Sequence, residues 1–224
     1  MSFQSFILRE VKSVLPPLAN LTEAAGMQAY MKGIAPYFGI KTPMRRQVLK
    51  EIFKRAPIPT SDELGQTARA LWKLQERECQ YAATDMLAYF QTLLNKEFVV
   101  DHCEYLLTTK SWWDTVDSLG SAVISPLTLR YNLLPVMKRW NKSEDPWLVR
   151  AAIQHQKGRK SETDVPLLLK FCHDHADADL FWITKAIGWA LRDLARFDRA
   201  SVTKFLREHP RLSKVAVREA LRHA

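Results

Sequence analysis

Glycine and strand-forming patterns are both scarce in this chain. It has seven glycines among 224 residues, and no run of alternating apolar and polar residues is long enough to predict a β-strand. A glycine-rich phosphate-binding loop is missing as well. The eleven prolines mostly separate segments whose apolar residues recur at helical spacing. These features predict an all-α chain.

Cysteine is equally sparse. Cys79, Cys103 and Cys172 are far apart, and an odd number without a CxxC pair predicts neither a disulfide framework nor a zinc–thiolate site. We expect three reduced, mostly buried thiols. The segment 172–175 (CHDH) resembles a metal cluster, but it lacks a second group of ligands, which favours a solvated helix end. We therefore expect no metal and no cofactor.

Long apolar runs are also missing, and none approaches the roughly 20 residues that cross a bilayer. Residues 1–15 mix acidic and basic side chains into an apolar pattern, which indicates an amphipathic helix rather than a signal peptide. We expect a cytoplasmic protein without membrane contact.

Positive charge is what the chain has in excess. The formal net charge is +9, and residues 181–224 alone hold ten Lys or Arg against four Asp or Glu. Such an excess predicts a polyanionic partner, with nucleic acid ahead of a membrane surface.

Helical segments follow one another along the whole chain. They are predicted over residues 3–15, 22–33, 42–56, 61–74, 76–94, 96–107, 111–124, 164–175, 179–197, 199–208 and 211–223, with two further helices that begin at Ser125-Pro126 and Asp145-Pro146. One polar residue per helix pair recurs every 33 to 37 residues, namely Arg46, Gln80, Asp117, Arg150, Lys185 and Arg218. This period predicts an α-solenoid, a right-handed superhelix of about six HEAT-like repeats, in a single domain over residues 1–224.

Two interpretations of this row of polar residues stay open. HEAT-like arrays often use acidic and basic side chains as ladders that tie neighbouring repeats together. Alternatively, the row is a basic concave track with Asp117 as its single acid, which would suit a phosphate backbone.

The segment Lys110–Ser118 (KSWWDTVDS) places an indole and a carboxylate on one helix face, because Trp113 and Asp117 are four residues apart. In isolation this pair favours a core tryptophan and a capping or salt-bridging aspartate. Trp113 and Trp189 lie one helical turn from members of the polar row, so we expect them to be exposed. We expect the remaining tryptophans that we can assign to be buried, namely Trp72, Trp112, Trp140 and Trp182.

Several segments closely resemble the AlkD-type DNA glycosylases of alkylation repair. The most specific are TKSWWDTVDS (109–118), WLVRAA (147–152) and KAIGWALRDLAR (185–196). GIKTPMRRQVLK (39–50), LWKLQERECQYAA (71–83) and MQAYMKG (27–33) resemble the N-terminal repeats of that family. The resemblance covers essentially the whole chain, in order and at compatible spacing.

This resemblance implies a superhelix that holds duplex DNA containing alkylated bases, and a monomer without cofactors that works at the chromosomal DNA. It places the family's catalytic carboxylate on Asp117, two lesion-flanking tryptophans on Trp113 and Trp189, and an active-site arginine on Arg150. We expect further DNA contacts from Tyr30, Lys41, Thr42, Arg45, Lys110, Ser111, Lys185 and Arg192. Lys41 stands where the family is expected to have glutamine, although a lysine suits a phosphate.

The implied reaction is hydrolysis of the N-glycosidic bond of N3-methyladenine and N7-methylguanine. These bases are already cationic, so they leave without a general acid. A fixed carboxylate at Asp117 would stabilise positive charge on the sugar and orient a water. Arg150 would hold a phosphate next to the lesion. Because no lysine nucleophile is needed, we expect a monofunctional enzyme that leaves an abasic site. The alternatives are a non-catalytic binder of damaged or branched DNA and a HEAT-repeat scaffold for protein interactions.

Overall fold

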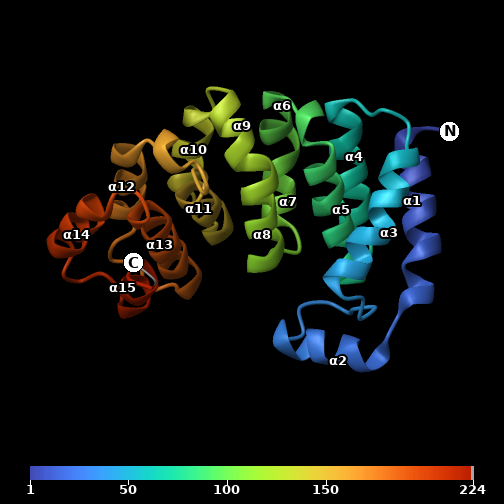
Figure 1. Ribbon diagram of the computed structural model, residues 1–224, viewed down its shortest axis with the longest axis horizontal. Coiled ribbons are helices and arrows are strands. Elements are labelled where there is room, and N and C mark those ends of the chain that lie inside the picture. The colour runs from blue at the N-terminus through green and yellow to red at the C-terminus, as the bar shows by residue number, and fades with distance from the viewer. Residues whose placement is uncertain (223–224) are drawn as a thin grey trace. The chain divides into compact units, whose positions relative to one another are not determined.

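Every regular element in the computed structural model, which describes residues 1–222, is a helix (Figure 1). The all-α fold expected from the sequence is therefore confirmed over these residues. They gather into two compact units, Met1–Lys110 and Ser111–Ala224. No helix among them has the length and hydrophobicity that a membrane crossing requires.

The first unit is built on four helices that pack side by side, α1, α3, α4 and α5 (Figure 1). Its helices are α1 (Phe3–Val14), α2 (Leu21–Tyr30), α3 (Thr42–Arg55), α4 (Ser61–Trp72), α5 (Arg77–Tyr89), α6 (Lys96–Phe98) and α7 (Glu104–Thr108). A π-helical segment over Val99–Cys103 joins α6 to α7 without a break. Trp72 is fully buried at the end of α4, as predicted.

A buried carboxylate holds the loop that leads into α3. Glu78 accepts hydrogen bonds from the backbone N–H groups of Phe38, Gly39 and Ile40, at 2.8 to 3.1 Å. Gly39 has a φ of +85°, and a Cβ there would lie 2.1 Å from the carbonyl oxygen of Asn20. Only glycine fits this close approach, which sets where the chain enters α3.

The second unit is built around α13, which packs against α11, α12, α14 and α15. Its helices are α8 (Trp113–Leu119), α9 (Ser125–Arg130), α10 (Leu134–Asn141), α11 (Pro146–Ile153), α12 (Val165–His173), α13 (Phe181–Ala195), α14 (Arg199–Glu208) and α15 (Lys214–Ala220). Asp145 caps α11 by accepting from the N–H groups of Trp147 and Leu148, so the predicted start at Asp145-Pro146 is confirmed. Trp140 is buried, as predicted.

The predicted break before Ser125 is wrong. Residues Gly120–Ile124 form a π-helical turn that joins α8 directly to α9. The N–H of Ser125 donates to the carbonyl of Gly120, five residues back. Pro126 has no N–H and its ring crowds the carbonyl four residues before it, so a wider turn accommodates the proline without ending the helix.

Side-chain contacts tie equivalent positions of successive repeats together. Arg150 bonds to Asp117, Asn141 to Asp174 and Lys185 to Glu219, at separations of 33, 33 and 34 residues. These separations match the period seen in the sequence and agree with the predicted helical repeats. The ladder interpretation therefore applies to Asp117 and Arg150.

The interpretation of the polar row as an exposed basic track fails at Gln80. Gln80 has 0% of its surface exposed and donates to the carbonyl oxygens of Trp72 and Leu74. At the last position Arg218 is exposed, and its neighbour Glu219 is the side chain that turns inward. A shift of one residue turns a helical side chain by about 100°, which the repeat period alone does not resolve.

Candidate functional site

Asp117 lies on α8 with its carboxylate gripped by a single guanidinium. Arg150 of α11 donates from Nε to Oδ1 and from Nη2 to Oδ2, both at 2.8 Å. This two-point contact fixes the plane of the carboxylate as well as its position. The Asp117 side chain keeps 15% of its surface exposed, whereas that of Arg150 keeps 1%.

Arg150 is also bound from its other side. Its Nη1 donates to the carbonyl oxygen of Trp182 at 2.7 Å, at the start of α13. A guanidinium that is buried and bonded in this way is not placed to reach a phosphate. The structure thus gives Arg150 different partners from the phosphate contact expected from the sequence.

Trp189 lies on α13 among several positive charges. Its indole Nε1–H donates to a carboxylate oxygen of Glu219 at 3.0 Å. Four cationic groups lie 5.0 to 5.8 Å from the ring centroid, and they belong to Arg150, Lys157, Lys185 and Arg192. The indole is partly exposed, so this basic cluster around Trp189 borders the surface of the second unit.

The Glu219 carboxylate offsets part of the positive charge of this cluster. It accepts from Lys185 at 2.7 Å and from Arg192 at 3.3 Å, in addition to the indole. The hydrogen bond from Lys185, with a smaller contribution from Trp189, lowers the pKa of Glu219 below its ordinary value. The carboxylate is therefore ionised at neutral pH.

Trp113 begins α8, one turn before Asp117, and is partly exposed. The other acid of the segment, Asp114, accepts from the N–H of Thr115 at the helix start. The structure thus separates the two acids of KSWWDTVDS. Asp117 meets a buried arginine, whereas Asp114 accepts from the backbone of the residue that follows it.

Three further tryptophans form a cluster at the N-terminal ends of α8, α11 and α13. The rings of Trp112 and Trp182 lie 4.8 Å apart, and those of Trp147 and Trp182 lie 5.4 Å apart. All three are partly exposed, so the expectation that Trp112 and Trp182 are buried is wrong. Because they begin helices, their side chains have fewer neighbouring turns to cover them.

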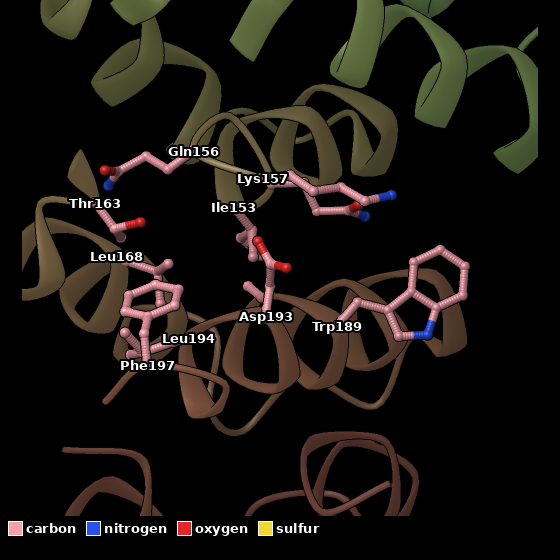
Figure 2. Close-up of a pocket in the computed structure, with 11 residues that line it drawn as sticks. Ile153, Gln156, Lys157, Thr163, Leu168, Trp189, Asp193, Leu194 and Phe197 are labelled. Carbon is pink, nitrogen blue, oxygen red and sulfur yellow. The ribbon is translucent and has the colours of Figure 1, made fainter. Parts of the chain in front are cut away.

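The hollows at this site are small. The hollow lined by Asp117, Gly120, Arg150 and Gln154 is too narrow to hold a water molecule. The next one, lined by Lys157, Trp189 and Asp193, has about 10 Å³, enough for roughly one water molecule (Figure 2). Neither hollow encloses the volume of a purine base.

A family model described as a DNA alkylation repair enzyme matches residues 11–224. The chain belongs to the DNA alkylation repair enzyme family. It is similar to a solved structure described as a predicted DNA alkylation repair enzyme from Enterococcus faecalis, with 32% identity and a TM-score of 0.83, covering 90% of this chain and 94% of that one.

Two solved structures from Streptococcus mutans share the fold of this alkylation repair family member. AlkD2 is 14% identical with a TM-score of 0.65, covering 98% of this chain and 97% of that one. The protein smu.31 of strain UA159 is 15% identical with a TM-score of 0.59, covering 98% and 96%. At this identity the similarity supports the fold alone. No curated protein matches the chain.

The other expected DNA contacts of this family member fall in varied surroundings. In the first unit, Tyr30 is 71% exposed at the end of α2. Lys41 is exposed and pairs with Glu23 at 2.8 Å, and Thr42 is exposed at the start of α3. These three side chains lie where a partner could reach them.

Arg45 and Lys110 are less available. Arg45 is buried, donates to Asp85 at 3.1 Å and lies over the ring of Tyr81. Lys110 is exposed but donates to the carbonyl oxygens of Lys73 and Leu74, and burial of its amine lowers its pKa. Both side chains therefore have structural partners. In the second unit, Ser111 is partly exposed.

The sequence did not point to two residues around Trp189, the basic Lys157 and the acidic Glu219. Lys157 follows α11, outside the repeat positions that were compared. Glu219 lies one residue from Arg218, which the repeat alignment selected instead. The acid at position 219 in a strongly basic C-terminal segment was the signal that could have found it.

The segment 172–175 meets separate partners. Cys172 is buried, His173 contacts His209 at 2.8 Å, and His175 bonds to the carbonyl oxygen of Asn141. No group of three or more metal-ligating side chains occurs among residues 1–222.

Proposed function

We propose that this protein is a DNA N-glycosylase that hydrolyses the N-glycosidic bond of cationic alkylated purines, N3-methyladenine and N7-methylguanine, in duplex DNA. Membership of the DNA alkylation repair enzyme family gives it a role in repair of alkylated DNA, with DNA as its partner. The proposal adds the bond that is broken and the residues that break it.

The observation that carries the proposal is the Asp117 carboxylate, held rigidly by Arg150 and still partly open to solvent. Loss of a cationic base leaves positive charge on the deoxyribose. A carboxylate that is already oriented stabilises this charge without reorganising. Each carboxylate oxygen uses one lone pair for Arg150, so another remains to stabilise the sugar or orient a water.

Arg150 then acts through Asp117. It fixes the position and the plane of the carboxylate, and phosphate binding falls to other side chains. Lys157, Lys185 and Arg192 surround the partly exposed Trp189, which suits the two phosphates that flank a lesion. Trp113 and Trp189 would pack against the sugar and backbone.

The small hollows support catalysis from the sugar side. A base that is already cationic needs no general acid, and therefore no pocket that delivers a proton to it. With water as the nucleophile, the product is an abasic site and no covalent intermediate forms with a lysine.

The direct test is release of 3-methyladenine and 7-methylguanine from methylated duplex DNA under single-turnover conditions. Asp117→Asn should slow release by about 100-fold or more, since it removes the charge that faces the sugar. Binding to the same DNA should persist. Asp114→Asn is the matched control, because this acid lies in the same turn of α8 and accepts from the backbone N–H of Thr115.

A release rate for Asp117→Asn within a few-fold of the wild type would contradict the proposal. Tight binding of methylated DNA by a wild type that releases no base would favour the non-catalytic binder instead.

A further inference from the structure

Glu219 lies on α15, and its side chain accepts a hydrogen bond from the Trp189 indole. It is 3% exposed, so its carboxylate is buried against α13. One oxygen accepts from Lys185 at 2.7 Å, and the other accepts from the Trp189 indole at 3.0 Å and from Arg192 at 3.3 Å. A single buried acid thus contacts three side chains of the candidate site.

The backbone is built to bring α15 this close. Gly188 immediately precedes Trp189, and a Cβ at that position would lie 2.6 Å from the Glu219 Cβ and 2.8 Å from the Ala216 carbonyl oxygen. Contacts this short with backbone cannot be relieved by rotating a side chain. The missing side chain at Gly188 therefore lets α15 approach α13 and bring the carboxylate to the indole.

We propose that Glu219 is a positioning residue, which holds the Trp189 indole in one orientation and so sets the wall against which the damaged nucleotide packs. The assignment of Trp189 to the lesion rests on the proposed glycosylase function. The hydrogen bond between Glu219 and Trp189 is independent of that function.

The chemistry of this contact requires a carboxylate. An indole N–H, a lysine ammonium and an arginine guanidinium are all donors, and an ionised glutamate accepts at both oxygens. Glutamine would turn an NH₂ group towards at least one of these donors. Glu219 also offsets positive charge, which permits the cations around Trp189 to remain close to one another.

The first test follows the indole N–H groups by ¹⁵N–¹H NMR. The chain has seven tryptophans, and Trp189→Phe identifies the resonance of interest. A proton bonded to a carboxylate lies downfield, so Glu219→Gln and Glu219→Ala should move the Trp189 resonance upfield and leave the resonance of Trp72, a residue of the first unit, in place. Val202→Ala, at a buried position of α14, is the control for general loosening of the second unit. A Trp189 resonance that does not move in either Glu219 variant would overturn the proposal.

The second test is a double-mutant cycle on single-turnover base release. Glu219→Gln should slow release by about 10-fold when Trp189 is present, because a misplaced contact surface costs rate. In a Trp189→Ala background the same substitution should have less than a 2-fold effect. Equal effects in both backgrounds would show that Glu219 acts elsewhere and would overturn the proposal.

The two tests separate the two ideas. If the wild type releases no base, the glycosylase function fails, and the NMR result still decides whether Glu219 holds the indole. If base release is normal and the NMR resonance is unmoved, only the positioning role fails.

Discussion

Replacing Arg150 with methionine should destabilise the second unit by about 3 kcal/mol. The change keeps much of the apolar stem and removes three hydrogen bonds, two to the Asp117 carboxylate and one to the Trp182 carbonyl. Hydrogen bonds to charged groups contribute roughly 1.5 to 3 kcal/mol each, and relief of burying the guanidinium offsets part of that sum. Asp117 remains behind without its partner, which adds to the cost.

Asp117→Asn should cost a similar amount, because it leaves a guanidinium that is 1% exposed facing a neutral amide. The double variant should be less destabilised than the sum of the two single variants, with a coupling free energy of about 2 to 3 kcal/mol. Each cost can be measured by urea unfolding followed by circular dichroism, with m-values compared because the two units need not unfold together.

A surface pair supplies the matched control. Arg196 lies 3.8 Å from Asp193 with 69% of its side chain exposed, so Arg196→Met should cost less than about 1 kcal/mol. Additivity of the Asp117 and Arg150 variants within about 0.5 kcal/mol would refute the reasoning, since it would mean that the two groups do not interact in solution.

Two further predictions concern groups away from the site. Burial lowers the pKa of His155 to about 4, so the folded protein keeps it neutral while the unfolded chain takes up a proton below about pH 6.5. Between pH 7 and pH 5 the wild type should therefore lose about 2 kcal/mol more unfolding free energy than His155→Gln, and parallel pH curves would contradict this. Burial also raises the pKa of the thiols of Cys79, Cys103 and Cys172. The native protein should therefore resist alkylation at pH 8 and react only when unfolded. Rapid labelling of the folded protein would contradict this, because it would show that the thiols are accessible.

The sequence predicted features that depend on helical periodicity. The apolar spacing and the punctuation by proline gave helices close to their observed bounds, and burial of Trp72 and Trp140 followed from the same pattern. The repeat period also selected Asp117 and Arg150 as equivalent positions, and the structure joins them by hydrogen bonds.

What could not be predicted depends on the angle at which one helix meets another. The period does not distinguish Arg218 from Glu219, because a one-residue difference becomes decisive only when α15 is packed against Gly188. Burial of Arg150 likewise depends on the carbonyl oxygen of Trp182, which belongs to the next repeat. Every residue has a backbone carbonyl group, so the sequence does not show which one a side chain will contact.

The π-helical turn at Gly120–Ile124 has a consequence for how this stretch tolerates changes in length. Removing one residue from the turn would impose ordinary α-helical pairing, in which the ring of Pro126 crowds the carbonyl four residues before it. All of α9 would then rotate by about 100° relative to Asp117 and shift by about 1.5 Å along the axis. Leu127, now buried, would leave its contacts while the carboxylate stayed in place. The number of residues between Asp117 and Ser125 therefore keeps the face that carries Asp117 in phase with the core-packing face of the same helix, and a single-codon deletion there should be more harmful than most substitutions.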